Sequence, residues 1–185
     1  MILPVVAFGH PILKSKAQEV DANYPELQTL IDNMFATMSH AEGVGLAAPQ
    51  VNKSLRLFVV DLSLLDIKEE EGKNYKQTFI NPVIVERVGD PVAYNEGCLS
   101  IPDIHEDVMR QPRIRIQYFD REWKQHDEWL DKVPARVCQH EYDHIEGILF
   151  VEYLSNLKKM VLRRKLNDMT RGIVKTHYKM IAGKR

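Results

Sequence analysis

The sequence has only two cysteines among its 185 residues and no long apolar run. A membrane-spanning helix needs about 18 consecutive apolar residues, and no window approaches that composition. The cysteines, Cys98 and Cys138, lie forty positions apart, which disfavours a disulfide framework and indicates a reducing compartment. The first eight residues lack a basic segment and are interrupted by Pro4, so we expect no signal peptide. These absences predict a cytoplasmic protein without a membrane anchor.

An excess of charge of one sign is also lacking. The chain has 25 Lys and Arg against 26 Asp and Glu, for a formal net charge of −1. This balance gives no indication that the body of the protein binds DNA. The apolar content of 44% over 185 residues is sufficient for a sizeable core. We therefore expect residues 1–185 to form a single domain that ends in a basic helix and tail, residues 155–185.

Apolar periodicity predicts three helices. The first covers Glu26–Met38. The second has Pro134 in its first turn and ends near Gly147, because proline suits the start of a helix and glycine its end. A last helix is predicted from about Ser155 to Arg171.

Alternating apolar and polar residues predict strands between these helices. Arg113–Phe119 alternates strictly, as expected for an antiparallel strand with one solvated face. The charged segment Leu64–Gln77 is predicted to be a solvated loop. The strand candidates are Leu55–Asp61, Thr78–Val88, Val92–Asn95, Val108–Arg110, Arg113–Phe119 and Gln125–Leu130. The expected fold class is α+β, with mostly antiparallel strands around the second helix.

The second helix contains the pattern His-Glu-x-x-His, at His140, Glu141 and His144. Residues four apart lie on one side of a helix, so a single cation can bridge both imidazoles. Glu141 lies close enough to accept a proton from a metal-bound water. The alternative is two satisfied core histidines and a surface glutamate. That alternative is disfavoured because a carboxylate beside the buried stripe needs a partner or a cation.

A catalytic metal takes three protein ligands and keeps an open position. In one group of metalloproteases a third histidine follows three residues after the glycine, but here Gly147 is followed by Phe150. No glutamate occurs after Glu152. The third ligand is therefore expected upstream of the helix.

Cysteine is the remaining candidate type. Cys138 precedes His140 by two residues, so it points about 200° away around the helix and cannot share the metal. Cys98 follows a glycine that allows close backbone approach, and we favour it as a ligand over an inert buried thiol. One thiolate and two neutral imidazoles suit Fe(II), Zn, Co or Ni.

Three segments together resemble a known family. They are Gly43–Gln50, Glu96–Ser100 and Gln139–Gly147, which read G-V-G-L-A-A-P-Q, E-G-C-L-S and Q-H-E-Y-D-H-I-E-G. In this order they closely resemble the three motifs of peptide deformylases. That family removes the formyl group from the N-terminal methionine of nascent polypeptides. The resemblance extends from Gly9–Leu13 to the end of the second helix.

The resemblance implies that Cys98, His140 and His144 hold one divalent metal, with water in the fourth position. Fe(II) is the expected native metal, and Zn, Ni or Co would substitute for it. Glu141 would deprotonate the water and later protonate the leaving amine. The chain is thus expected to be a metallohydrolase that releases formate from N-formylmethionyl peptides.

The resemblance also implies roles in substrate binding. Gln50 and the backbone N–H of Leu99 would stabilise the oxyanion. The glycine-containing segment would pair with the peptide as an added strand, and an apolar pocket would take the methionine side chain. The residues expected to contact the peptide are Gly43, Val44, Gly45, Val137 and Arg136.

Two further polar residues lie near these motifs. Arg110 could pair with Glu96 or Asp143 and so orient the metal helix, although an exposed strand arginine is the alternative. His105 follows Cys98 by seven residues, where some family members carry an arginine at the substrate rim. It is not expected to be a metal ligand.

The C-terminal tail is basic. Lys158–Arg185 contains ten Lys and Arg residues and one acid. Leu154, Leu157 and Val161 continue a helical stripe, by which the last helix is expected to pack on the domain. The basic face is either a solvated surface or, as the resemblance implies, a site that docks on RNA near the ribosomal exit. Met180–Arg185 is expected to fray.

Two other functions stay open at this point. One is a metallopeptidase that cleaves internal peptide bonds, which the missing downstream ligand disfavours. The other is a catalytically silent metal-binding or ribosome-associated module, which the intact Glu141 and Gln50 disfavour.

Overall fold

The computed structural model describes residues 1–183. Its helices are α1 (Leu27–His40), α2 (Lys132–Ile145) and α3 (Asn156–Thr170). Its strands are β1 (Val5–Val6), β2 (Gly45–Ala47), β3 (Leu57–Asp61), β4 (Lys76–Val88), β5 (Val92–Cys98), β6 (Ile101–Arg110), β7 (Arg113–Phe119), β8 (Gln125–Asp131) and β9 (Met180–Ile181). Short 3₁₀ turns cover Pro11–Lys14, Ala48–Val51, Glu69–Glu71 and Phe150–Tyr153. Within residues 1–183, no helix combines the length and apolar character needed to cross a membrane.

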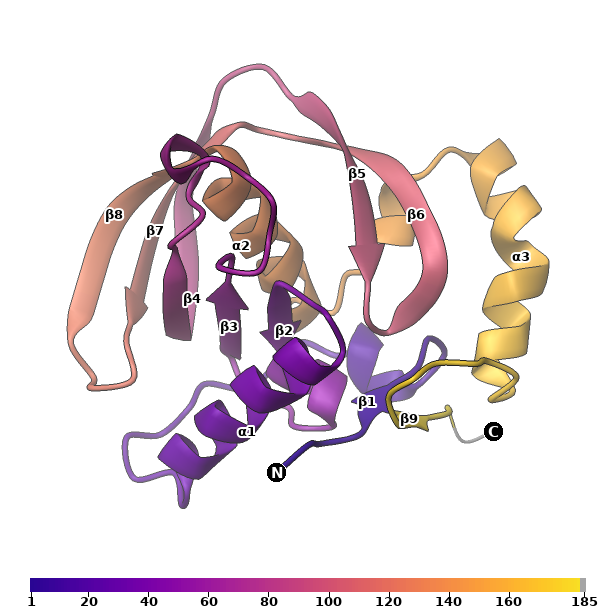
Figure 1. Ribbon diagram of the computed structural model, residues 1–185, viewed down its shortest axis with the longest axis horizontal. Coiled ribbons are helices and arrows are strands. Elements are labelled where there is room, and N and C mark those ends of the chain that lie inside the picture. Colours follow the sequence, from indigo (N-terminus) through magenta and orange to yellow (C-terminus); the bar gives the residue numbers. More distant parts are fainter. Residues whose placement is uncertain (184–185) are drawn as a thin grey trace.

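Most strands are antiparallel, which confirms the predicted α+β class. One five-stranded sheet has the order β2-β3-β4-β7-β8, and β5 and β6 form a separate hairpin. In Figure 1, α2 runs between this sheet and the hairpin. The predicted alternation in β7 is confirmed, because Ile114, Ile116 and Tyr118 are buried against the core.

The helix α2 is buried on nearly every side, rather than along the single stripe that its periodicity indicated. Val137 and Cys138 belong to an apolar cluster with Phe79 and other side chains of the sheet. The opposite side of α2 meets the β5–β6 hairpin, where Arg136 reaches backbone carbonyls of both strands. The predicted stop is confirmed at Gly147, whose φ is 76°. The fold thus places the His-Glu-x-x-His motif between two β layers.

The strand predictions were right in position but incomplete in extent. β5 continues to Cys98 and β6 begins at Ile101, so the hairpin is longer than predicted. The two-residue turn between them brings the end of β5 to the metal helix. The short strands β1, β2 and β9 were not predicted, because two or three residues carry no measurable periodicity. The segment 64–75 is a loop, as predicted, apart from one 3₁₀ turn, but Lys76 and Gln77, predicted to be in the loop, already belong to β4.

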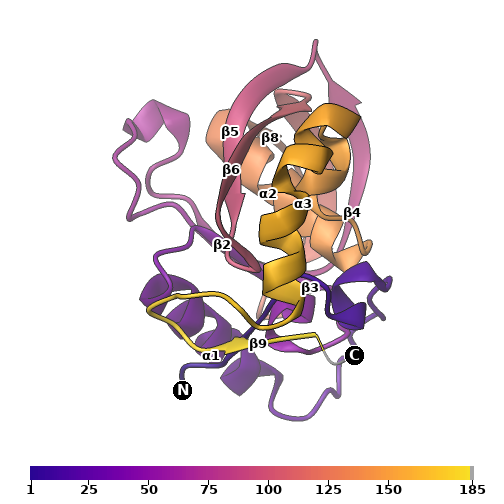
Figure 2. The same cartoon turned by 90° about the vertical axis from the view of Figure 1, so that its right-hand side faces the viewer.

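The predicted packing face of the last helix was wrong. Leu157 and Val161 are 72% and 74% exposed, whereas Leu166 and Met169 in the second half of α3 are buried. Leu154 is buried, but it precedes the helix. Only the later turns of α3 reach the core, in a second apolar cluster that includes Leu13 and Phe150. The first turns project beside the hairpin (Figure 2). A local stripe cannot show where the surface of a neighbouring element ends.

The predicted fraying from Met180 onward was also wrong for the first residues of that segment. Met180 and Ile181 form β9, which pairs in parallel with Val5 and Val6 of β1. Lys184 and Arg185 lie outside the described residues. The pairing joins the two ends of the chain, so no local pattern could indicate it.

Candidate metal centre

Three candidate metal ligands converge in the interior. Cys98 is the last residue of β5, and His140 and His144 lie on successive turns of α2. One ligand atom from each of the three lies within 4.8 Å of the others. The Cys98 Sγ and His144 Nε2 atoms are 3.2 Å apart. Cys138 is fully buried in the apolar cluster instead, so the structure separates the two cysteines as the helical angles predicted.

The cluster suits a divalent metal. Ligand bonds of about 2.0–2.3 Å in a tetrahedron put ligand atoms about 3.3–3.8 Å apart, and the 3.2 Å between Cys98 Sγ and His144 Nε2 is close to that range. Burial and the neighbouring His140 lower the pKa of His144, which favours the neutral imidazole that a metal requires. Burial alone would lower the pKa of His140, but hydrogen bonds to Cys98 and Glu96 hold it above its usual range. A metal requires the neutral imidazole, so metal binding at His140 would release a proton.

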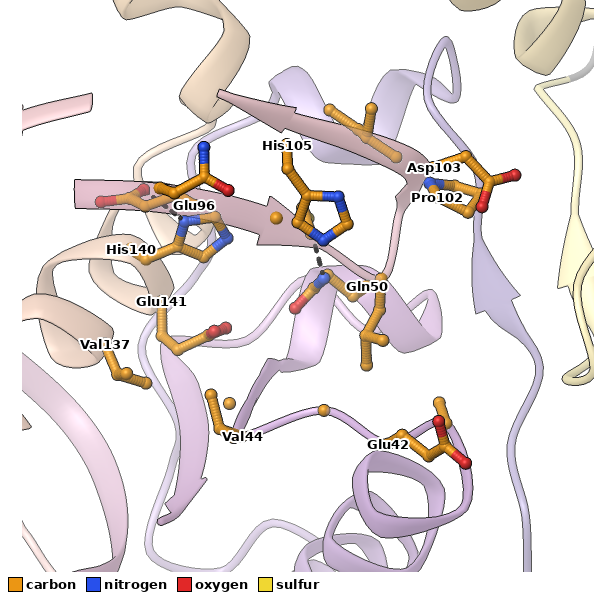
Figure 3. Close-up of a pocket in the computed structure, with 18 of the residues that line it drawn as sticks. Glu42, Val44, Gln50, Glu96, Pro102, Asp103, His105, Val137, His140 and Glu141 are labelled. Atoms are coloured by element: carbon orange, nitrogen blue, oxygen red, sulfur yellow. Dashed lines mark hydrogen bonds and ion pairs between the residues drawn. The ribbon is translucent and has the colours of Figure 1, made fainter. Parts of the chain in front are cut away.

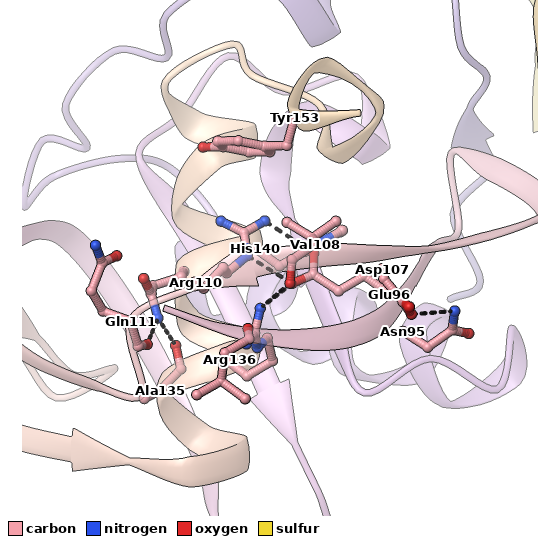
Figure 4. A network of polar contacts seen from close by, with 12 residues as sticks. Asn95, Glu96, Asp107, Val108, Arg110, Gln111, Ala135, Arg136, His140 and Tyr153 are labelled. Atoms are coloured by element: carbon pink, nitrogen blue, oxygen red, sulfur yellow. Dashed lines mark hydrogen bonds and ion pairs between the residues drawn. The ribbon is translucent and has the colours of Figure 1, made fainter. Parts of the chain in front are cut away.

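A carboxylate network fixes the orientation of the first histidine (Figure 4). His140 Nδ1 donates to Glu96 Oε2 at 2.9 Å, which leaves Nε2 for the metal. Arg110 donates to Glu96 Oε1 at 2.7 Å and to Asp143 Oδ2 at 2.7 Å, so it joins the hairpin to α2. Arg136 adds a third contact to Glu96, at 3.1 Å. Burial opposes ionisation of Glu96, but the His140 and Arg110 hydrogen bonds lower its pKa to about 2.

Two partners of this network were missed by the sequence analysis. Tyr153 donates to Asp143 Oδ2 at 3.0 Å, and Arg110 lies over its ring at 5.0 Å from the centroid. Tyr94 lies against the guanidinium of Arg136 at 5.5 Å. Neither tyrosine belongs to a motif. The only available signal was that two buried arginines and two acids require further polar or aromatic neighbours.

Replacing Glu96 with glutamine is expected to weaken metal affinity by about 10- to 100-fold, because the amide is a poorer acceptor for His140 and removes the negative charge that Arg110 and Arg136 share. Competition with a chromophoric chelator measures the change. Glu106 pairs with Glu96 across the hairpin but binds the surface residue Lys158, so Glu106→Gln is the matched control. Wild-type affinity in Glu96→Gln would show that the carboxylate does not support the ligand.

Glu141 lies beside the three ligands and is 4% exposed. Its Oε2 has no hydrogen-bond partner among the described residues, and burial raises its pKa to about 7. A Cβ atom at Gly45 would lie 2.3 Å from Glu141 Oε1, so only glycine allows β2 to approach this carboxylate. The arrangement leaves a buried acid–base group with a free oxygen next to the ligand cluster.

Gln50 has a fixed orientation next to Cys98. Its Oε1 accepts a hydrogen bond from the Ala47 N–H at 2.8 Å, so its amide nitrogen faces the cluster. That nitrogen lies 3.3 Å from Ser100 Oγ and 3.5 Å from Cys98 Sγ. Ser100 is fully buried and was not singled out from the sequence, although it ends the Glu96–Ser100 motif.

A cavity of about 750 Å³ opens onto this cluster. Figure 3 shows Val137, His140 and Glu141 on one side of it and Glu42 and Asp103 on the other. The residues expected to contact a peptide, Gly43, Val44, Gly45, Arg136 and Val137, all line the cavity, together with Gln50, Leu99 and His105. Arg110, Asp143 and His144 do not line it and lie behind its wall.

His105 and the β2 edge shape this cavity. The His105 ring lies over Gly97, where a Cβ atom would be 2.6 Å from it, and it is not among the three converging ligands. β2 is the edge strand of the five-stranded sheet, and among the described strands it pairs only with β3. Its second edge is therefore available on the side of the cavity.

An α+β fold that holds a Cys/His₂ cluster and a buried free carboxylate at the foot of a cavity defines a metallohydrolase. Comparison with known proteins specifies which kind. Residues 2–160 match the family model of polypeptide deformylase, and the chain belongs to that family. Deformylation of nascent polypeptides is the known function of this family of metal-dependent enzymes, so the chain is a hydrolase. Neither the endopeptidase nor the silent-module alternative is supported.

Individual relatives agree over nearly the whole chain. A peptide deformylase of Christiangramia forsetii is 49% identical over 97% of this chain and 95% of its own length. One of Cytophaga hutchinsonii is 49% identical over 97% of each. The crystal structure of a peptide deformylase from Legionella pneumophila is 38% identical, with a TM-score of 0.81, and covers 92% of this chain and 96% of its own. A Met-Ala-Ser-bound deformylase of Acinetobacter baumannii is 36% identical, with a TM-score of 0.78, over 83% of this chain and 99% of its own.

Proposed function

We propose that the Cys98, His140 and His144 cluster is the catalytic centre at which this chain hydrolyses N-formylmethionyl peptides. The observation that carries the proposal is the position of Glu141, which is buried beside three converging ligand atoms and next to an open strand edge. A structural carboxylate in that environment would have a hydrogen-bonded partner for each oxygen.

When bound, a divalent metal in this ligand set lowers the pKa of a water molecule and polarises the formyl carbonyl. Glu141 accepts the proton of the attacking water on its free oxygen and later passes it to the leaving amine. A carboxylate with a pKa raised to about 7 by burial suits both steps, because it gains and loses a proton near neutral pH.

Gln50 and Leu99 supply the two donors that stabilise the developing oxyanion in this proposal. The Gln50 amide nitrogen is held toward Cys98 by the bond between its oxygen and the Ala47 N–H. The backbone N–H of Leu99 is the second donor, and the Leu99 carbonyl is held by the Tyr178 hydroxyl at 2.8 Å. Donors that are already oriented stabilise an oxyanion by about 3–4 kcal/mol each in comparable sites.

The peptide binds as an added strand along Gly43, Val44 and Gly45, the segment that leads into the free edge of β2. The methionine side chain occupies the apolar part of the cavity beside Val137 and the stem of Arg136. Because the guanidinium of Arg136 is bound to Glu96 and two carbonyls, its stem is a fixed wall.

Formate release from formyl-Met-Ala, measured beside cleavage of a longer unformylated peptide, tests the proposed function. We expect formate from the first and no new amino termini from the second. Cleavage of internal bonds in the second peptide would contradict the proposal.

We propose Fe(II) as the native metal, with Zn, Ni or Co able to replace it. A thiolate-ligated Fe(II) at the foot of an open cavity is expected to react with oxygen, which oxidises the iron, Cys98 or both. The iron form should therefore lose most of its activity within hours in air. The nickel and zinc forms should retain theirs, with the zinc form slower throughout. Iron enzyme that stays fully active in aerated buffer would count against this assignment.

The proposal extends to the surroundings of the enzyme. We propose that residues 1–185 are one catalytic domain that acts in the cytoplasm, where nascent polypeptides are made. The basic, solvent-exposed first turns of α3 support docking on RNA near the ribosomal exit. Co-sedimentation with ribosomes at low and high salt measures that docking.

A further inference from the structure

The C-terminal segment Lys175–Tyr178 lies outside the residues that match the family model, which end at Met160 within α3. After α3 the chain turns at Gly172, whose φ is 76°, and passes back across the molecule to β9. Figure 2 shows this return passing over α1. The segment therefore belongs to the part of the chain to which the family comparison assigns no role.

Several contacts hold the segment in place. Tyr178 is buried in a small cluster with Val5 and Ala41, and its hydroxyl donates to the Leu99 carbonyl at 2.8 Å. His177 Nε2 lies 3.1 Å from the carbonyl of His40, at the end of α1. The backbone carbonyl of Lys179, the residue that follows the segment, accepts a hydrogen bond from the Val5 N–H at 2.8 Å. The segment is thus joined to β1, to α1 and to the turn after Cys98.

The same segment lines the cavity of the metal centre. All four residues, Lys175, Thr176, His177 and Tyr178, contribute to its wall, as do Ala41 and Glu42. Glu42 lies across the cavity from Val137 and Glu141 in Figure 3. Because the segment contacts the end of α1 and the Leu99 carbonyl, it forms the wall at the Glu42 end.

The direction of a bound peptide follows from the segment Gly43–Gly45, whose last residue begins β2. Gly45 lies against Glu141, whereas a Cβ atom at Gly43 would lie 2.7 Å from the side chain of Leu99. A peptide whose formyl group reaches the catalytic centre at Gly45 must therefore run toward Gly43 and then past Glu42. In an added strand each residue advances by about 3.3 Å, so the third residue of the peptide lies opposite Gly43. Later residues then arrive at the Glu42 end of the cavity.

We infer that Lys175–Tyr178 is the far wall of the peptide cleft and contacts the third and following residues of the formylated peptide. This inference rests on the proposed strand addition along β2. Tyr178 and the contact between His177 and His40 anchor the wall, and the exposed side chains of Lys175 and His177 line the cavity that the peptide enters. The wall therefore contributes to the hydrolysis of longer peptides and not to that of a formylated dipeptide.

Two formylated substrates, formyl-Met-Ala and formyl-Met-Ala-Ser-Ala, distinguish the contribution of the wall to hydrolysis from that of the catalytic centre. The test variant is Lys175→Ala/His177→Ala, which removes two exposed side chains that line the cavity. The matched control is Ile173→Ala/Lys179→Ala, two exposed positions of the same return segment that do not line the cavity. We expect the test variant to lower kcat/KM for the tetrapeptide by about two- to fivefold, the scale of exposed contacts. The dipeptide value and both control values should stay unchanged.

The dipeptide makes the two proposals distinguishable. Wild-type enzyme that releases no formate from formyl-Met-Ala would contradict the proposed function itself. If the test variant lost kcat/KM equally on both peptides, or lost none on the tetrapeptide, the proposed wall would be contradicted. The proposed catalytic centre would not be affected by either result. Thermal unfolding of both double variants, monitored by circular dichroism, identifies any loss that comes from misfolding.

Discussion

The Glu141→Ala variant is expected to bind one metal ion per chain and to lower kcat for formyl-Met-Ala by about 10²–10⁴-fold, the usual contribution of a positioned general base. The expectation follows from the structure of the site. Glu141 is buried next to the ligands, and its Oε2 has no partner among the described residues, so its removal breaks no described bond to that oxygen. Metal content by elemental analysis and formate release by a coupled assay give the two readouts.

Glu141→Gln keeps the volume of the side chain and removes only the ability to accept the proton, so it should be nearly as inactive as the alanine variant. The matched control is Glu146→Gln, which follows α2 on the same stretch of chain and pairs with Arg56 away from the cavity. This control should deformylate at the wild-type rate. If Glu141→Gln retained a near-normal kcat, another group would have to handle the proton.

The second large effect concerns the two cysteines. Cys98→Ala is expected to weaken metal affinity by more than about 100-fold, because loss of a direct ligand exceeds the loss of a residue that only orients one. Cys138→Ala is expected to retain stoichiometric metal, because Cys138 lies in the apolar cluster with Phe79 and not among the converging atoms. Anaerobic purification followed by metal analysis compares the two variants.

The two variants also differ in their expected effect on folding. Cys138→Ala removes one buried sulfur atom and should lower the free energy of unfolding by about 1 kcal/mol. Cys98→Ala should leave the metal-free protein about as stable as the wild-type protein without metal. Metal loss in Cys138→Ala, with retention in Cys98→Ala, would contradict the ligand assignment.

Much of the candidate site could be predicted from the sequence because its residues lie in three short motifs. The spacing of His140 and His144 defines one side of a helix, and the helical angle excludes Cys138. The choice of Cys98 required a chemical argument about an incomplete ligand set. The roles of Ser100 and Tyr178 could not be predicted in this way, since they contact Gln50 and Leu99, which lie 50 and 79 positions away in the chain. Tyr153 lies only ten positions from its partner Asp143, but it belongs to none of the motifs.

Arg136 illustrates the limit for a residue that the sequence did identify. Its place on the helix turn before His140 indicated a pocket wall, and it does line the cavity. The sequence did not indicate that its guanidinium binds Glu96 and the carbonyls of Val92 and Val108. Those partners come from a hairpin whose register with α2 is set by packing.

The sequence by itself determined the longer helices and strands and the spacing of the candidate metal ligands. Strand alternation in β7, the start and stop of α2 and the His-Glu-x-x-His spacing are local properties, encoded by residues fewer than five positions apart. The tertiary structure alone decided which face of α3 is exposed, that β9 pairs with β1, and that the C-terminal return lines the cavity. These features depend on contacts between residues more than a hundred positions apart, such as Val5 with Met180 and His40 with His177. Such contacts form only between complementary surfaces that exist after each segment has folded. The periodicity within either segment therefore does not predict them.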